Sequence, residues 1–267
     1  MQVVRMIGLA ALTVLISHAA AADDAPQLML ETGGHLGIVR SVAFTTKNRL
    51  VSAGDDKVVR VWDLATKQTD FVLRGQAGPG KEGSITALAI SPDDRWLVTG
   101  GWFSADGALE PCCGDVRVYD LSTRQLVALL KGHTDALTSL AFSSDGRHLL
   151  SGSADKTAIL WDVGSRTALR EFSSHKAAVT NAAFVDGGAT VVTAGSDGSV
   201  RLWSTSDGAV KREYRLSAPV TALAISPQGV LIAAGLANGE IHKINPNIEA
   251  GQSTLANLQE NLTSGKK

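Results

Sequence analysis

One set of residue types that could catalyse hydrolysis occurs three times in this sequence: a histidine, a serine or threonine, and an aspartate. A serine activated by a histidine, which an aspartate orients, is the arrangement found in many hydrolases. In each copy the aspartate follows the hydroxyl residue by four positions, and a tryptophan follows the aspartate by six. The three sets are His35, Ser52, Asp56 and Trp62; His133, Ser151, Asp155 and Trp161; and His175, Thr193, Asp197 and Trp203.

The recurrence argues against catalysis, because a catalytic triad normally occurs once in a chain. Trp161 and Trp203 are 42 residues apart, and two weaker copies with Tyr119 and Ile244 in place of the tryptophan extend the series to five. Each copy contains three or four short apolar runs separated by turn sequences such as SPDD or SSDG, which is typical of antiparallel strands. Because one such sheet cannot bury both of its faces, we expect the five sheets to stack around an axis as a β-propeller.

The GH…WD pattern at this spacing resembles the WD40 repeat, and the resemblance covers about residues 28–245. It implies an all-β, WD40-type β-propeller in which each histidine, hydroxyl and aspartate set is a buried relay that ends on the tryptophan indole. The relay is then structural, since the indole N–H needs a buried partner. The resemblance also makes five copies a departure, because most members of the family have seven.

The two ends of the repeat region offer a way to close the ring. The segment LMLET at 28–32 precedes the first copy as an outer strand precedes each later copy, and it can pair with residues 239–244 of the last. We therefore predict five blades of four-stranded antiparallel sheets, with the ring closed by the N-terminal strand. Closure between two chains, by self-association, and membership of a longer propeller are alternatives.

The N-terminus has the three-part layout of a secretory signal peptide. One arginine precedes an apolar run over residues 6–16, and small residues follow at 19–22. The run is shorter than the about 20 residues of a membrane-spanning helix, although a retained anchor is the alternative. We predict a signal peptide at 1–22, a propeller at 23–248 and a C-terminal tail at 249–267. The mature protein would be periplasmic or secreted, with no membrane insertion after cleavage.

Composition narrows the function classes. The net charge is −1 and basic residues are not clustered, which argues against nucleic acid as a partner. Outside the relays, the sequence has no concentration of carboxylates, histidines or metal ligands. We therefore predict a protein that is not an enzyme and has no metal or cofactor. The leading hypothesis is a scaffold that binds a protein or peptide.

The resemblance also implies a binding face around the central opening. The second copy adds a loop on this scaffold, because Trp62 and Tyr119 are 57 positions apart rather than 42, and loops on rigid scaffolds often bind partners. Two alternatives to partner binding remain. The threonines around the opening could reflect only their preference for β-strands, and the aromatic residues of the added loop could cover their own sheet. The predicted partner-binding residues are Arg40, Asp55, Thr86, Trp102, Phe103, Thr138, Thr180 and Thr221.

Cys112 and Cys113 are the only cysteines and are adjacent. In an oxidising compartment they could form a disulfide, strained because neighbouring Cα atoms are about 3.8 Å apart. The alternative function is therefore a redox- or ligand-binding accessory protein that uses this loop, associated with a cytochrome or a larger complex. A bridge that only stiffens the loop, or two free thiols, would carry no such function.

Overall fold

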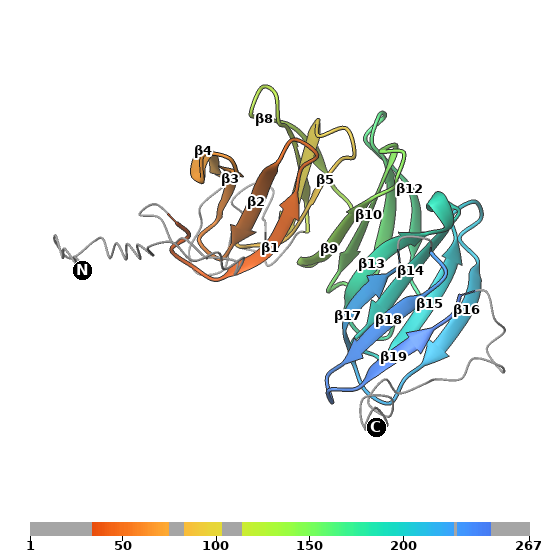
Figure 1. Cartoon of the computed structure of the whole chain (residues 1–267). Helices are drawn as coiled ribbons and strands as arrows, with labels where there is room; N and C mark the ends of the chain where they lie inside the picture. The colour runs from red at the N-terminus through yellow and green to blue at the C-terminus, as the bar shows by residue number, and fades with distance from the viewer. Residues whose placement is uncertain (1–33, 75–82, 103–113, 227–228, 247–267) are drawn as a thin grey trace, which may run out of the picture.

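The computed structural model describes residues 34–74, 83–102, 114–226 and 229–246, which form five antiparallel sheets (Figure 1). The first sheet comprises β1 (Val39–Phe44), β2 (Arg49–Gly54), β3 (Val58–Asp63) and β4 (Gln68–Arg74), and the second comprises β5 (Ile85–Ile90), β6 (Trp96–Gly101), β7 (Val116–Asp120) and β8 (Gln125–Leu130). The third comprises β9 (Leu137–Phe142), β10 (His148–Ser153), β11 (Ala158–Asp162) and β12 (Thr167–Phe172), and the fourth comprises β13 (Val179–Val185), β14 (Thr190–Gly195), β15 (Ser199–Ser204) and β16 (Val210–Arg215). The fifth comprises β17 (Val220–Ile225), β18 (Ile232–Leu236) and β19 (Ile241–Ile244).

Each sheet is a meander in which successive strands pair with one another. The turns follow from local sequence, as the β2–β3 and β10–β11 connections show. Lys57 and Lys156 adopt positive φ angles of 68° and 75° there, each directly after an aspartate. Three-residue hairpin loops of this kind place their last residue at positive φ, which glycine adopts most easily, and the corresponding turn after β14 has Gly198 there.

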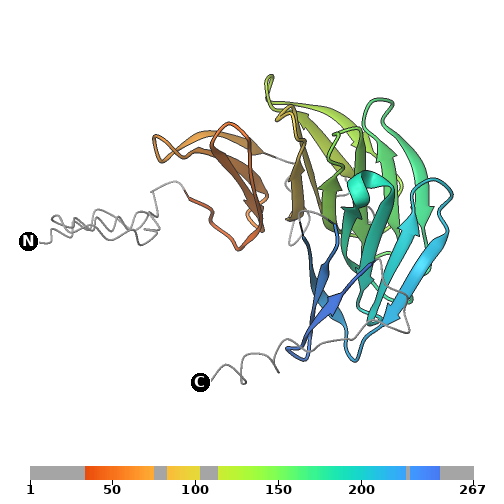
Figure 2. The same ribbon diagram turned by 45° about the vertical axis from the view of Figure 1, so that its right-hand side comes forward.

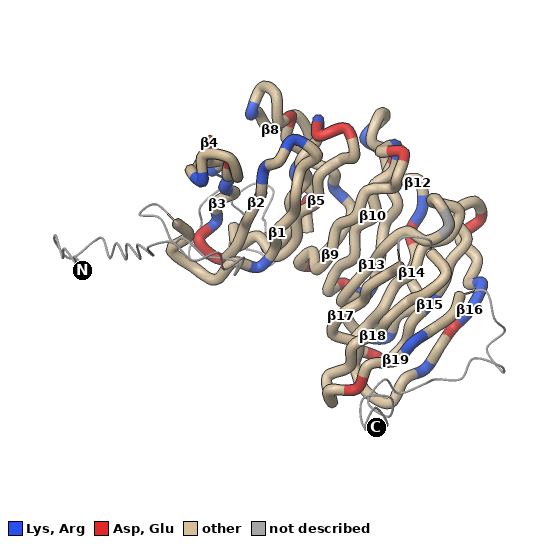
Figure 3. Tube along the Cα trace, in the orientation of Figure 1, with Lys and Arg blue, Asp and Glu red and all other residues tan. Residues whose placement is uncertain are grey.

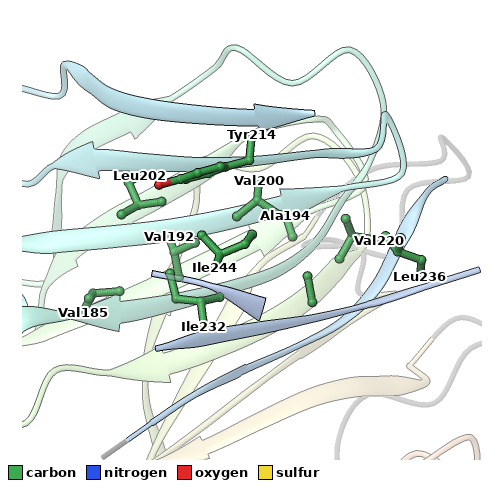
Figure 4. Packing of buried hydrophobic residues seen from close by; sticks show 11 residues of the cluster. Val185, Val192, Ala194, Val200, Leu202, Tyr214, Val220, Ile232, Leu236 and Ile244 are labelled. Atoms are coloured by element: carbon green, nitrogen blue, oxygen red, sulfur yellow. The ribbon is translucent and has the colours of Figure 1, made fainter. Parts of the chain in front are cut away.

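Neighbouring sheets pack face to face through apolar side chains. The innermost strands β1, β5, β9, β13 and β17 contact one another in that order. Figure 4 shows the layer between the fourth and fifth sheets, in which Val192 and Leu202 lie opposite Ile232 and Ile244. Similar clusters lie between the other three neighbouring pairs of sheets. The all-β propeller fold with five sheets is thus confirmed, and burial between sheets is what holds it together.

The ends of the series differ from its middle. Four sheets have four strands as predicted, whereas the fifth has three strands among the described residues. The predicted closing strand, residues 28–32, lies outside the described residues. In Figure 2 the first and fifth sheets lie on either side of an opening. The inner strand β1 exposes Val42 and Phe44 on the face away from the second sheet, because Ala43 between them packs against the cluster shared with that sheet. The described sheets therefore form an arc that they do not close themselves.

Charged residues lie mainly at the turns and on the outer strand β16, with both signs mixed (Figure 3). No helix among the described residues is long and apolar enough to cross a membrane. The predicted signal peptide and the whole of the predicted tail fall outside the described residues. The described chain thus provides a set of packed sheets whose strands and connecting loops carry the candidate site residues.

Candidate functional site

The relay of the third sheet is complete. His133 lies with Nε2 2.8 Å from Ser151 Oγ and Nδ1 2.8 Å from Asp155 Oδ2, and Trp161 Nε1 donates to Ser151 Oγ at 2.8 Å. Because the carboxylate can only accept, Nδ1 carries the proton and Nε2 accepts from the serine hydroxyl. Every polar atom of this histidine and serine is thereby occupied.

The relay aspartate also ties two loops together. Asp155 accepts hydrogen bonds from the backbone N–H of Thr134, in the loop before β9, and of Thr157, after the β10–β11 turn. Burial raises the pKa of Asp155, but the hydrogen bonds from His133 and Thr157 lower it more, so it lies well below its usual range. The ionised carboxylate thus holds the β10–β11 turn against the loop that enters the inner strand.

The first and fourth sheets repeat this arrangement. In the first sheet the histidine Nε2 lies 2.7 Å from the serine Oγ, which accepts from the indole N–H at 2.7 Å. In the fourth sheet the corresponding distances to the threonine Oγ1 are 2.7 and 2.8 Å. The histidine–aspartate contacts are 2.8 Å and 3.1 Å respectively. The twelve predicted relay residues are therefore brought together as three sets: His35, Ser52, Asp56 and Trp62; His133, Ser151, Asp155 and Trp161; and His175, Thr193, Asp197 and Trp203.

Arg201 joins the fourth relay and was not predicted. Its buried guanidinium lies 3.2 Å from Asp197 Oδ2 and 2.8 Å from Glu213 Oε1. Burial lowers the pKa of His175, although the hydrogen bond and charge of Asp197 act in the opposite direction. A sequence signal for Arg201 existed, because Arg60 holds the same place in the third strand of the first sheet.

The second and fifth sheets lack the relay, as the weaker sequence copies predicted. Thr99 occupies the hydroxyl position of the second sheet, but Tyr119 replaces the tryptophan. The Thr99 hydroxyl is fully buried and has no hydrogen-bond partner among the described residues. In the fifth sheet Asn238 stands at the aspartate position and Ile244 at the tryptophan position.

The relay geometry is unsuited to nucleophilic catalysis. Ser151 and Thr193 are fully buried, so a substrate could not approach either hydroxyl. Each hydroxyl also accepts an indole N–H, which a nucleophile in an active site would not need to do. Within the described ranges, no group of three or more histidine, cysteine, aspartate or glutamate residues could hold a metal ion.

Three of the four threonines predicted to line the binding face make bonds between sheets. Thr86 donates to the carbonyl of Leu137 in the next sheet, and Thr138 donates to that of Val179 at 2.6 Å. Thr180 continues the series to the carbonyl of Val220 at 2.9 Å. Thr221, in the last sheet, is exposed and donates to Gly235 of its own sheet at 3.2 Å.

Other predicted partner-binding residues lie at one end of the first two sheets, Arg40 at the start of β1 and Asp55 and Trp102 in loops. Arg40 and Asp55 form an ion pair of 2.7 Å on the first sheet, and Trp102, directly after β6, is 44% exposed. Leu36 and Ile38, in the loop before β1, are also exposed and were not predicted. The predicted residues Phe103, Cys112 and Cys113 lie outside the described residues.

A small cavity of about 170 Å³ opens on the opposite ends of these sheets, at the β1–β2 turn. Most of its lining residues are polar or charged, although they expose mainly their apolar atoms to it. One of them, Asp94, accepts hydrogen bonds from the backbone N–H groups of Thr46 and Lys47. The cavity contains no part of any relay. It is lined by Thr45, Lys47, Arg49, Val61, Asp94, Leu121 and Ser122.

Comparison with known proteins agrees with the repeat pattern. The family model described as "WD domain, G-beta repeat" matches residues 27–63, 72–110, 124–162 and 166–204. The chain is 35% identical to transducin beta-like protein 3 of Rattus norvegicus over 130 residues, which are 48% of this chain and 15% of that protein. It is 33% identical to transcription factor unc-37 of Caenorhabditis elegans over 122 residues, 45% of this chain and 17% of that one. It is 30% identical to the target of rapamycin complex subunit wat1 of Schizosaccharomyces pombe over 116 residues, 43% of this chain and 32% of that one.

Proposed function

Because the chain belongs to the WD40 repeat family, whose members act as protein-interaction scaffolds, we propose that it is a non-enzymatic scaffold in the periplasm or outside the cell. It binds a protein or peptide partner on the face where the loops before the inner strands emerge. Fold membership alone identifies no partner, so the argument depends on the side chains at this face.

One observation carries this proposal: apolar side chains stand exposed beside an ion pair on one face of the first two sheets. Leu36 is 95% exposed and Trp102 is 44% exposed. Leu36 lies just before β1 and Trp102 just after β6, so both lie at the same end of their sheets. Arg40 and Asp55 add charge at that end. Exposed aromatic and arginine side chains are the residue types that dominate protein interfaces, which favours a protein partner over a small anion.

The relays support a scaffold in another way. Each relay aspartate fixes the loop before an inner strand, as Asp56 fixes the backbone N–H of Leu36 at 3.1 Å. A loop held in this way loses little conformational freedom when a partner binds, so the entropic cost of forming the complex is smaller. The histidines and hydroxyls thus support the binding face without contacting the partner.

The experiment is capture of a partner by variants of the purified protein. Tagged wild-type protein is exposed to periplasmic extract, the retained partner is identified by mass spectrometry, and its Kd is measured. We expect Trp102→Ala and Arg40→Glu each to weaken binding by about tenfold or more, as loss of an interface hot spot does. Leu169→Ala is the matched control, because Leu169 is 47% exposed but lies on the outer strand β12. Unchanged Kd values for both test variants would refute the proposed face.

The proposed location has its own test. Expression of the whole chain in a Gram-negative host, followed by fractionation and N-terminal sequencing, should yield a periplasmic protein that starts near Asp23. Recovery of the uncleaved chain from the cytoplasm or membrane fraction would overturn the proposed location.

A further inference from the structure

The first sheet exposes the face that every later sheet buries. In the other four sheets, the inner strand directs three side chains into the layer shared with the preceding sheet, as Leu137 and Phe142 of β9 show. The corresponding residues of β1 are Val39, Val42 and Phe44. Val42 is 58% exposed and Phe44 is 72% exposed, whereas Leu137 is fully buried. An apolar sheet face of this kind is expected to have a partner.

The fifth sheet exposes the opposite face. In the fourth sheet, Val200 points into the layer shared with the fifth sheet and is fully buried. Ile241 holds the same register in the fifth sheet, since it pairs with Gly235 as Val200 pairs with Ala194. Ile241 is 45% exposed. On the same face, Lys243 pairs with Ala233 as Leu202 pairs with Val192, and Lys243 is exposed where Leu202 is buried. The fifth sheet therefore repeats the inner contact at Ile241 and replaces it with a lysine at the neighbouring position, and the first sheet carries the apolar opposite half.

The hydrogen bonds of the inner-strand threonines also indicate that the fifth sheet lacks a following neighbour within the described part of the chain. Three inner-strand threonines donate to a carbonyl of the following sheet, whereas Thr221 of the fifth sheet has no following sheet to bond among the described residues. The acceptors Leu137, Val179 and Val220 each precede the threonine position of their strand. In the first sheet that place belongs to Val39. Its carbonyl is thus the equivalent acceptor for Thr221 of a preceding fifth sheet.

We propose that two copies of this chain associate head to tail, with the first sheet of one packed on the fifth sheet of the other. The contact reproduces in trans the sheet-to-sheet packing that the chain already contains four times. In Figure 2 the first and fifth sheets of a single chain lie apart, so a second molecule can supply the complementary face. The two surfaces differ, so the contact is heterologous and can extend into a ring or a chain of subunits.

The association is independent of the proposed partner-binding face. Phe44 and Ile241 lie on the outer sheet faces, whereas Asp55 and Trp102 lie on loops and Arg40 lies at the start of β1, where it is paired with Asp55. Loss of partner capture would leave the head-to-tail contact untouched. Failure to self-associate would likewise leave the scaffold proposal standing.

The test is sedimentation velocity of the whole mature chain from low to high micromolar concentration. We expect the mean mass of wild-type protein to rise with concentration. Phe44→Asp and Ile241→Asp should each stay monomeric, and Val42→Asp should repeat the effect of Phe44→Asp. Leu169→Asp places the same charge at a comparably exposed position of the outer strand β12 and should associate as the wild type does.

Mixing the two blocked variants decides the geometry. Phe44→Asp keeps an intact fifth-sheet face and Ile241→Asp keeps an intact first-sheet face, so an equimolar mixture should form a dimer and nothing larger. A wild-type protein that stays monomeric, a Phe44→Asp protein that associates normally, or a mixture that stays monomeric would each overturn the proposal. An Ile241→Asp protein that still dimerises alone would also overturn it, because the first-sheet face would then pair with itself.

Discussion

The third and first sheets contain the same relay but differ in what covers it. In the third sheet, Trp161 is buried in the layer shared with the second sheet. In the first sheet, the equivalent Trp62 is partly exposed, because no described sheet precedes it. Nevertheless the indole N–H donates to a serine hydroxyl at 2.8 Å in the third sheet and at 2.7 Å in the first.

The difference separates two contributions to stability. The relay bonds form within one sheet and its own loops, so they do not need a neighbour. Burial of the tryptophan does need a neighbouring sheet, since the apolar ring faces outward from its own sheet. Matched substitutions in the two sheets therefore measure how much each contribution adds.

The largest difference is expected for the tryptophans. Trp161→Ala should reduce the free energy of unfolding by about 3–5 kcal/mol, because it removes a fully buried aromatic and leaves a cavity. Trp62→Ala should cost clearly less, because part of the Trp62 ring is already in contact with water. Urea denaturation of both variants, followed by circular dichroism, measures the two losses. Equal losses would mean that the first sheet is covered in solution as fully as the third.

The relay aspartates should show a smaller difference. Asp155→Ala should cost about 1–3 kcal/mol, because it leaves buried donors of His133 and of the Thr157 backbone without a partner. Asp56→Ala should cost less, since Val58 stands where the third sheet has Thr157 and supplies no hydroxyl to the aspartate. Denaturant unfolding of the two variants gives the comparison. A loss near zero for Asp155→Ala would show that its relay is not buried in the protein.

Acidification should distinguish the fourth sheet. The folded-state pKa of His175 lies below its ordinary value of about 6.5, so the unfolded chain takes up a proton first as the pH falls. The fourth relay therefore contributes its full stabilisation at a pH above the ordinary histidine pKa. This contribution to the free energy of unfolding decreases as the pH falls from there toward the pKa of His175 in the folded protein. The free energy of unfolding should fall less steeply between pH 7 and 5 in His175→Gln than in the wild type. An unchanged slope would contradict the role given to His175.

The repeat and its relays could be predicted because their hydrogen bonds join residues at constant spacing. The sequence therefore located all twelve relay residues. It placed an arginine two residues before the tryptophan in both the first and the fourth copies, but not the ion pair of Arg201 with Glu213, which depends on the neighbouring strand. Nor could it separate the threonines that bridge two sheets from Thr221, because this depends on whether another sheet follows. Closure of the ring stays a prediction, since the segment at 28–32 lies outside the described residues.

The inter-sheet threonines give the smallest and most local comparison. Thr138→Val keeps the side-chain shape but removes the 2.6 Å bond to the Val179 carbonyl, and it should cost about 1 kcal/mol. Thr221→Val should change stability by less than about 0.5 kcal/mol, because the Thr221 hydroxyl is exposed and bonds only within its own sheet. Urea unfolding at low protein concentration, where head-to-tail contacts are dissociated, measures both. If the two losses were equal there, Thr221 would have an inter-sheet acceptor within the single chain, and the arc would close on itself rather than on a second copy.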